Sequence, residues 1–144
     1  MSESSAFELK AIGVVKSSGP VSEITVFQEY CSGLQSLAEF SHIIILYWFH
    51  LRDGREDRSV LSVIPKRHPG APPVGVFASR SPSRPNPVGL CVAEIIEVVN
   101  CTLTVKGLDA FEGSPIIDIK PYLSGNDVVL ETRAPEWASH KSPT

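Results

Sequence analysis

The chain has 144 residues, of which 42% are apolar, and a formal net charge of −3. This length predicts one domain with a core of its own, because domains cluster near ~100–150 residues. The apolar content excludes a disordered chain. A membrane helix is excluded as well, because the longest uninterrupted apolar run, residues 43–49, is far shorter than the roughly 20 residues that a span requires.

The three cysteines, Cys31, Cys91 and Cys101, form no C-x-x-C pair. An odd number without a paired motif favours a reducing compartment, with the thiols as small core residues. The first ten residues also lack the basic start and apolar stretch of a signal peptide, so we expect a cytoplasmic protein.

Short segments of alternating or β-branched apolar residues recur every ten to fifteen residues and predict β-strands. In chain order they lie at residues 7–17, 22–27, 42–50, 59–64, 74–79, 87–99, 102–106, 115–120 and 128–132. The run at 42–50 is expected to be a central strand covered on both faces. Leu34, Leu37 and Phe40 at helical spacing indicate a short helix or irregular turn at 30–40.

No other segment favours a helix, so the predicted fold is all-β: a small antiparallel β-barrel or sandwich with at most one or two short helices. Asn100 and Cys101 mark a turn between two strands, which are therefore expected to pair. We expect a single domain over residues 1–134 and a flexible C-terminal tail over residues 135–144.

The net charge is unevenly distributed along the chain. Residues 52–84 carry seven bases and three acids, a local balance of +4, so the remainder sums to −7. Seven of the prolines lie between residues 65 and 87. A stretch that is both basic and rich in proline predicts a stiff, exposed loop system that can meet an anion. A solvated proline loop without a ligand is the alternative.

The densest group of polar residues is GVFASRSPSRPNPVGLCVAEI, residues 75–95, in which Arg80 and Arg84 are four residues apart. Prolines follow Ser81, Arg84 and Asn86 directly, and each proline restricts the residue before it. Guanidinium groups match carboxylates and phosphates, and a carboxamide can hold a backbone turn or the polar edge of a ligand. The alternative is a structural loop that these same side chains pin in place.

The second group is LDAFEGSPIIDIKPY, residues 108–122. Residues 112–115 predict a turn that leads into a strand. Asp118 and Lys120 share one face of that strand, since side chains alternate. Such a pair is usually a surface ion pair of small energetic value, unless that face lines a cleft.

Several common sites are absent from the sequence. The four histidines have no metal-ligand spacing, so no metal is expected. There is no G-x-G-x-x-G, no G-x-x-x-x-G-K-[ST] and no G-x-S-x-G. Cys91 lies within an apolar strand and is predicted to be a core residue rather than a nucleophile.

The segments IGVVKSS, LAEFSHIIILYWFH, GVFASRSPSRPNPVGL and GLDAFEGSPIIDIKPY resemble the TrmO family of tRNA methyltransferases, also called TsaA-like or YaeB-like proteins, over most of residues 12–122. The resemblance implies a small antiparallel β-barrel, usually a homodimer, that binds S-adenosyl-L-methionine without a Rossmann domain. It also implies methyl transfer to N6 of threonylcarbamoyl-adenosine, next to the anticodon of tRNA.

The family's functional positions can be carried over residue by residue. Contacts with S-adenosylmethionine would fall on His50, Leu51, Arg80, Leu90, Glu112, Gly113, Ser114 and Pro115. The candidates for binding the substrate are Arg84, Asn86, Lys120 and Tyr122. Asp118 and Glu112 are the carboxylates available to remove the N6 proton.

The sequence departs from the family pattern in three places. Residues 17–26 lack the P-R-Q-like cofactor loop of the longer bacterial members, and a chain that ends at Thr144 is expected to lack their C-terminal extension. Glu112 and Ser114 stand where Asp and Thr are more usual.

The basic stretch at residues 52–84 would hold the anticodon loop through its phosphates, with Arg84 as a phosphate contact. Two other functions fit the same residues: a β-barrel that binds a nucleotide or RNA without chemistry, and a methyltransferase that acts on another small substrate.

Overall fold

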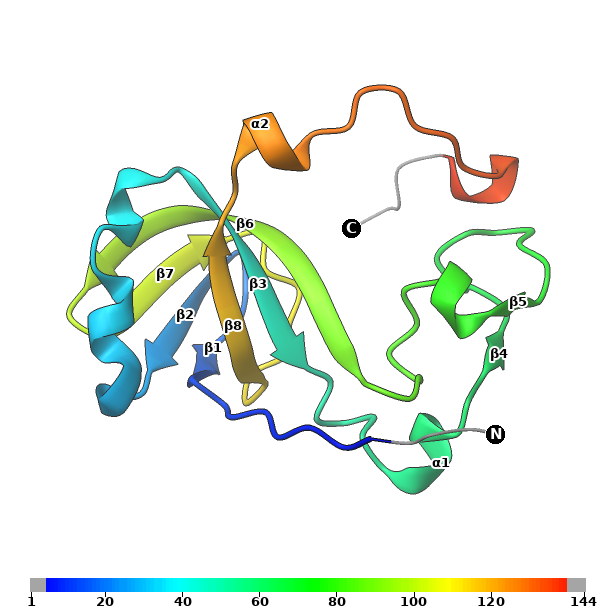
Figure 1. Cartoon of the computed structure of the whole chain (residues 1–144), viewed down its shortest axis with the longest axis horizontal. Coiled ribbons are helices and arrows are strands. Elements are labelled where there is room, and N and C mark those ends of the chain that lie inside the picture. Colours follow the sequence, from blue (N-terminus) through cyan, green and yellow to red (C-terminus); the bar gives the residue numbers. More distant parts are fainter. Residues whose placement is uncertain (1–4, 140–144) are drawn as a thin grey trace. The chain divides into compact units, whose positions relative to one another are not determined.

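The computed structural model describes residues 5–139 (Figure 1). The chain divides into two compact units. Of the described residues, the first unit contains those up to Trp48 together with Leu90–Tyr122, and the second contains Phe49–Gly89 together with those from Leu123 onward. Within the described residues, no helix has the length and hydropathy that a membrane crossing requires.

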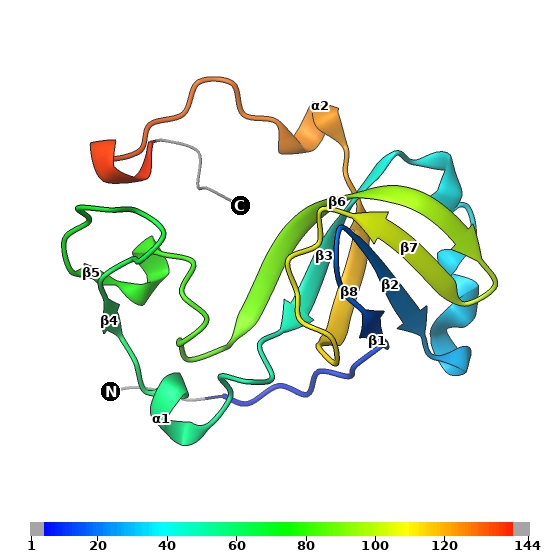
Figure 2. The same ribbon diagram turned by 180° about the vertical axis from the view of Figure 1, so that it is seen from behind.

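The first unit is a closed barrel, seen from both sides in Figures 1 and 2. Going round the barrel, its strands are β1 (Gly13–Ser17), β2 (Val21–Val26), β7 (Thr102–Lys106), β6 (Val88–Val99), β3 (His42–Trp48) and β8 (Pro115–Pro121). The register determined for β1–β2, β2–β7, β6–β7, β3–β8 and β1–β8 is antiparallel in each case. The predicted small antiparallel β-barrel is confirmed.

The barrel interior is filled by alternate residues of its strands. The side chains with no exposed surface are all branched aliphatics, namely Ile24, Ile43, Ile45, Leu103, Val105 and Ile116. In β3, buried residues alternate with half-buried ones, so the prediction of a strand fully covered on both faces is wrong. In a closed barrel, only the inward face of a strand reaches the core.

Close strand pairing at β1 depends on a glycine. A Cβ atom at Gly13 would collide with the Thr25 carbonyl oxygen of β2. Bulges also shift the strand register in β1, β6 and β8, with an extra residue between Val15 and Ser17 in β1, for example. Bulges increase the local twist and bend of a strand, which helps a small sheet to close on itself.

Other predicted elements are corrected by the structure. The first strand begins at Gly13 rather than at residue 7. The segment at 30–40, predicted to be a short helix or an irregular turn, forms two 3-10 helices, η1 (Gln28–Leu34) and η2 (Leu37–Glu39). The predicted strand at 128–132 is not formed: α2 (Ser124–Asp127) precedes it, and Leu130 is 89% exposed with no strand partner. An apolar segment remains irregular when no strand lies beside it to accept its hydrogen bonds.

The second unit contains short elements only. The helix α1 (Arg55–Arg58) leads to a two-stranded sheet, β4 (Ser62–Val63) with β5 (Val74–Gly75), and η3 (Val76–Ala78) follows. The strands predicted at 59–64 and 74–79 are therefore shorter than expected. In the predicted tail, η4 (Glu136–Ala138) is formed, and residues 140–144 lie outside the described residues.

Two of the three cysteines are joined. Cys31 in η1 and Cys101 in the β6–β7 turn form a disulfide, although they are 70 residues apart in the chain. They meet because the Val26 N–H at the end of β2 donates to the Cys101 carbonyl at 2.8 Å, and η1 follows β2 directly. The prediction of free core thiols is therefore wrong for this pair. Cys91 is not part of this disulfide and is half-buried.

Candidate functional site

The turn that precedes β8 is tied to the barrel wall. Gly107 and Gly113 both have positive φ angles, 94° and 88°, which favour glycine. The Gly113 N–H donates to the Val15 carbonyl at 2.8 Å, and the Val15 N–H donates to the Ser114 carbonyl at 3.0 Å. The predicted turn is therefore present, and β1 fixes its position.

A buried tyrosine supports the same turn. The Tyr47 hydroxyl of β3 donates to Asp109 Oδ1 at 2.7 Å, and Tyr47 is almost completely buried. Neither residue stands out in the sequence. Because 62 residues separate them and no motif spacing connects them, only the closed barrel brings them together.

The turn presents polar main chain and one acid beside an apolar strand. Glu112 is exposed, whereas Ser114 is only 2% exposed. The Cys91 thiol contacts the Gly107 carbonyl at 3.0 Å, which places the start of β6 beside the start of the turn. Leu90 precedes Cys91 on that strand and is 49% exposed. Four of the predicted cofactor contacts, residues 112–115, thus lie in one short turn, and Leu90 is exposed on β6.

In the second unit, Arg84 holds the loop at residues 79–87, which we call the arginine–proline loop, from within. Its Nη1 donates to the carbonyls of Ser79 at 3.0 Å and Ser81 at 3.1 Å. Arg80 is exposed, and its side chain makes no hydrogen bond or ion pair within the described residues. The two arginines of this loop thus differ: Arg84 shapes the loop, and Arg80 is available to a ligand.

The helix α1 holds the far end of this loop. Arg58 Nε donates to the Pro85 carbonyl at 2.8 Å, and Arg58 Nη2 donates to Asn86 Oδ1 at 3.4 Å. The predicted substrate residue Asn86 is therefore one of the groups that define the loop.

His50 and Leu51 lie in a turn joined to the same loop. The Phe49 N–H donates to the Pro87 carbonyl at 2.8 Å, and the Arg52 N–H donates to the Phe49 carbonyl at 3.0 Å. His50 is half-buried, and Leu51 is 65% exposed. Three predicted cofactor contacts, His50, Leu51 and Arg80, thus belong to one connected loop system in the second unit.

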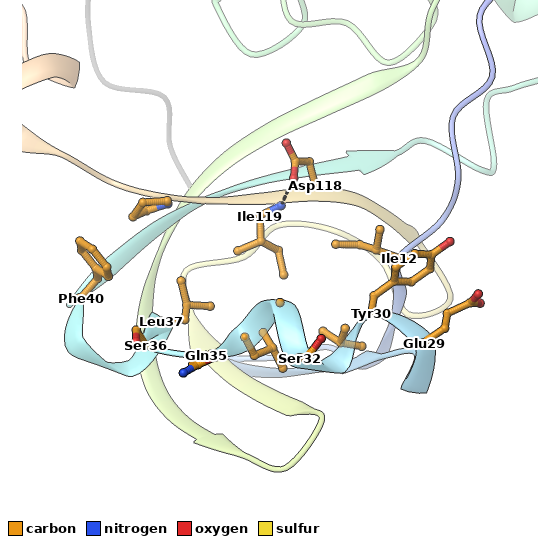
Figure 3. A pocket seen from close by; sticks show the side chains of 14 residues that line it. Ile12, Glu29, Tyr30, Ser32, Gln35, Ser36, Leu37, Phe40, Asp118 and Ile119 are labelled. Carbon is orange, nitrogen blue, oxygen red and sulfur yellow. Dashed lines mark hydrogen bonds between the residues drawn. The ribbon is translucent and has the colours of Figure 1, made fainter.

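Asp118 and Lys120 form an ion pair, with 3.0 Å between Nζ and Oδ2. Asp118 Oδ1 also accepts the Ile119 N–H at 2.9 Å. Asp118 borders a pocket of about 570 Å³ between β8 and the η1–η2 segment, where Ile119 points toward Leu37 and the Asp118 carboxylate lies on the other side of the strand (Figure 3). None of the predicted cofactor contacts lines this pocket.

Tyr122 follows β8, where its N–H donates to the His42 carbonyl at 3.0 Å. Asp118, Lys120 and Tyr122 therefore lie along or just beyond β8, whereas Glu112 lies in the turn before it. Among residues 5–139, His, Cys, Asp and Glu side chains do not gather in groups that could hold a metal ion.

A closed antiparallel barrel with a glycine turn at one strand junction defines a class of small β-barrel proteins distinct from the doubly wound nucleotide-binding folds. Residues 13–128 match the family model of the tRNA-methyltransferase O N-terminal domain. The chain belongs to this family, and the resemblance found in its motifs is confirmed.

Known relatives and structures agree with this assignment. The S-adenosyl-L-methionine-binding protein of Archaeoglobus fulgidus is 46% identical over 144 residues, covering 88% of this chain and 99% of the relative. The tRNA (adenine(37)-N6)-methyltransferase of Mus musculus is 39% identical over 102 residues, covering 71% of this chain and 23% of the relative. The crystal structure of TrmO from Pseudomonas aeruginosa aligns with a TM-score of 0.76 at 24% identity, covering 97% of this chain and 66% of that one, which shows a shared fold.

Proposed function

We propose that this protein transfers a methyl group from S-adenosyl-L-methionine to N6 of an adenine in tRNA. The family match over residues 13–128, with the arginine–proline loop and the glycine turn both formed, carries the proposal. The archaeal relative is named for binding S-adenosyl-L-methionine, and the mouse relative is named for N6 methylation of adenine 37 in tRNA.

The residues present suit the proposed cofactor. Arg80 is an exposed guanidinium with no partner in the described part of the chain, so it can hold the methionine carboxylate. Leu51 and Leu90 offer exposed apolar surface, and Glu112 can accept hydrogen bonds from ribose hydroxyls or the adenine amino group. His50, Gly113, Ser114 and Pro115 complete the proposed contacts.

When bound, the cofactor supplies an activated methyl group on a positively charged sulfur. The protein then has to align the N6 nitrogen with that methyl group at roughly 3–3.5 Å. N6 is a weak nucleophile because its lone pair is delocalised into the purine, so removal of its proton assists the attack. We propose Glu112 for this role, since Asp118 is already engaged by Lys120 and by the Ile119 N–H.

We further propose that the substrate base is threonylcarbamoyl-adenosine in the anticodon loop. Arg55 and Lys66 are exposed cations without ion pairs in the described residues, and they can meet phosphates while the base is unstacked. Arg84 and Asn86 would act by shaping the loop, and Lys120 and Tyr122 stay candidate substrate contacts. We also propose that the protein is a cytoplasmic homodimer with one functional domain over residues 1–134.

Binding of the cofactor is expected to stabilise the protein. A ligand at about 100 times its Kd adds about 2.7 kcal/mol to the free energy of unfolding, which corresponds to a rise in Tm of roughly 5–10 °C for a chain of this size. A thermal unfolding series with S-adenosylmethionine and S-adenosylhomocysteine measures this shift. No shift with either compound at millimolar concentration would contradict the cofactor site.

Transfer itself requires a second measurement. Labelled methyl from S-adenosylmethionine is expected to appear as N6-methylated threonylcarbamoyl-adenosine after digestion of bulk tRNA to nucleosides. The archaeal relative's name states binding only, which supports one alternative: a protein that binds the cofactor without transferring methyl. A thermal shift without transfer to tRNA or to small substrates would favour that alternative.

Arg80 and Arg84 are expected to fail differently when each is replaced by alanine. Arg80→Ala removes a charge-assisted hydrogen bond to the cofactor, so the Kd for S-adenosylmethionine should rise about tenfold or more. The Tm of the protein without cofactor should not change, because Arg80 has no partner in the described residues. Arg84→Ala removes two hydrogen bonds within the loop, so Tm should fall.

The salt dependence of tRNA binding tests whether Arg84 shapes the loop or contacts a phosphate. Its Nη1 is directed at carbonyls, so we expect Arg84→Ala to weaken tRNA binding without changing the slope of affinity against salt. This differs from the phosphate contact expected from the sequence. A flatter dependence of tRNA affinity on salt in Arg84→Ala would show that Arg84 contacts a phosphate after all.

A further inference from the structure

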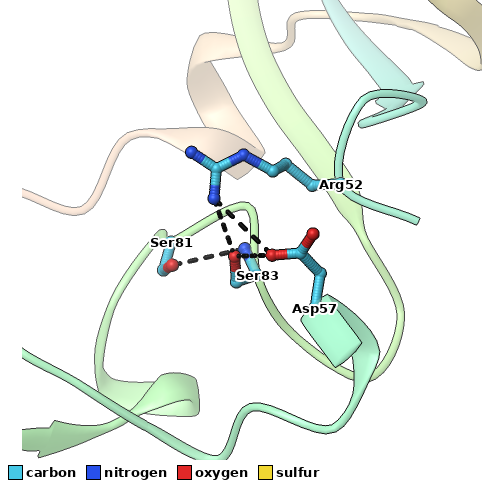
Figure 4. Close-up of polar contacts among 4 residues, drawn as sticks. All are labelled: Arg52, Asp57, Ser81 and Ser83. Atoms are coloured by element: carbon cyan, nitrogen blue, oxygen red, sulfur yellow. Dashed lines mark hydrogen bonds and ion pairs between the residues drawn. The ribbon is translucent and has the colours of Figure 1, made fainter. Parts of the chain in front are cut away.

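Three side chains meet at a hydroxyl beneath the arginine–proline loop (Figure 4). The Ser83 hydroxyl donates to Asp57 Oδ1 at 2.6 Å and accepts a hydrogen bond from Arg52 Nη1 at 3.0 Å. Arg52 Nη1 also lies 3.6 Å from Asp57 Oδ1. We refer to Arg52, Asp57 and Ser83 as the Ser83 clamp.

The clamp is the base of a chain of serine contacts. Ser83 is only 8% exposed, and its N–H donates to the Ser81 hydroxyl oxygen at 3.3 Å. The Ser81 N–H in turn donates to the Ser79 hydroxyl oxygen at 3.3 Å, and the Ser79 hydroxyl donates to the Val76 carbonyl at 3.0 Å. Every second residue from 79 to 83 is thus held by a side-chain hydrogen bond.

Arg80 lies within this held segment, between Ser79 and Ser81. Arg84 draws the carbonyls of these two serines toward its own guanidinium, while Arg80 is exposed. A flexible arginine loses conformational freedom when it binds an anion, and a fixed backbone reduces that cost. The position of Arg80 therefore depends on contacts that its own side chain does not make.

We propose that the Ser83 clamp positions the Arg80 guanidinium for an oxyanion of the reactants. This inference rests on the proposed methyltransferase function. The oxyanion is either the carboxylate of S-adenosylmethionine or a phosphate of tRNA, since a guanidinium recognises both by the same paired hydrogen bonds. Arg52, Asp57 and Ser83 are positioning residues, and none of them is placed in contact with a reactant.

The hydroxyl at position 83 is the central group because it donates and accepts at once. Ser83→Ala removes both hydrogen bonds and leaves Arg52 and Asp57 without the group between them. Asp57→Asn keeps an acceptor of the same shape but removes the negative charge beside Arg52. Glu56→Gln is the matched control, because Glu56 is an exposed acid of the same helix α1 and its side chain makes no hydrogen bond or ion pair in the described residues.

Proteolysis tests the clamp without any reference to activity. Trypsin cleaves after Arg80 only when the loop opens, and it does not cleave after Arg84 because a proline follows. In Ser83→Ala and in Asp57→Asn, the peptide that begins at Ser81 should be released at least about fivefold faster, because local opening of the loop becomes easier. The double variant should be no faster than the more affected single variant, because both changes break one network.

Ser83→Thr keeps the hydroxyl and should cleave at the wild-type rate, as should Glu56→Gln. Equal cleavage rates in Ser83→Ala, Asp57→Asn and Glu56→Gln would overturn the clamp. Asp57 is partly exposed, so Asp57→Asn provides this comparison even where Ser83→Ala does not fold.

Steady-state kinetics test the positioning role and identify the oxyanion. In Ser83→Ala and Asp57→Asn, one KM should rise about tenfold while kcat stays within about twofold, which is the pattern of lost uniform binding. A rise in the KM for S-adenosylmethionine assigns Arg80 to the carboxylate, and a rise in the KM for tRNA assigns it to a phosphate. Unchanged KM values together with faster cleavage would overturn the positioning role. A wild-type protein that methylates no tRNA would contradict the proposed function, whereas the cleavage comparison would still decide the clamp.

Discussion

Reduction of the Cys31–Cys101 disulfide is expected to lower the free energy of unfolding by about 4 kcal/mol, because the bond closes a long loop. The two cysteines are 70 residues apart, so the unfolded chain gains considerable freedom when the bond is broken. In the folded protein the disulfide joins η1 to the β6–β7 turn. Denaturant unfolding with and without a reductant measures the difference, with the m-value fitted separately for each form because the reduced unfolded chain is less compact.

Thiol counting provides the control for this prediction. Alkylation of the unreduced, unfolded protein should modify Cys91 alone, and the Cys31→Ser/Cys101→Ser variant should unfold at the same denaturant concentration with and without reductant. Three alkylated thiols in protein that was never reduced would contradict the disulfide. A Cys91→Ser variant should keep the full response to reductant.

Most of the barrel could be predicted from the sequence, because its strands carry their own signal. The strands β3, β6, β7 and β8 begin and end within two residues of the predicted ranges. Their alternation of large aliphatics reflects an interior that only every second side chain can reach. The segment at 128–132 has a similar composition but no strand beside it, and the presence of a neighbour cannot be deduced from the segment itself.

The candidate site was predictable only in part, for a related reason. Proline and arginine spacing identified the loop around Arg80, and glycine identified the turn at Gly113, because these are local signals. The partners of that loop and turn are long-range. Ser83 meets Asp57 across 26 residues and Arg52 across 31, and Tyr47 meets Asp109 across 62, with no spacing rule to connect any of these pairs.

The disulfide illustrates the same limit. An odd number of cysteines favoured free thiols, yet the pairing depends on the Val26 hydrogen bond that brings the end of β2 to Cys101. The composition of the chain shows which cysteines could pair, but only the strand topology determines which of them lie close enough to form a bond.

Replacement of Glu112 by glutamine is expected to lower kcat by roughly 10²- to 10⁴-fold, the range for loss of a general base. The amide has nearly the same shape and still accepts hydrogen bonds, so the KM for S-adenosylmethionine should change little. Single-turnover transfer of labelled methyl to tRNA measures the chemical step directly, and a thermal shift with the cofactor confirms that binding persists.

Asp118→Asn is the matched comparison, because it makes the same chemical change at the other candidate carboxylate. Asp118 is bonded to Lys120 and to the Ile119 N–H, and its side chain is 43% exposed. Because Asp118 is not the proposed base, Asp118→Asn should leave the rate within about threefold. The fold should persist as well, since an exposed ion pair of this kind contributes only about 0–1 kcal/mol to stability. A large loss of rate in Asp118→Asn with a small one in Glu112→Gln would instead identify Asp118 of β8 as the base. Comparable small losses in both would mean that the N6 proton leaves to solvent, with alignment of the two reactants as the main contribution of the protein.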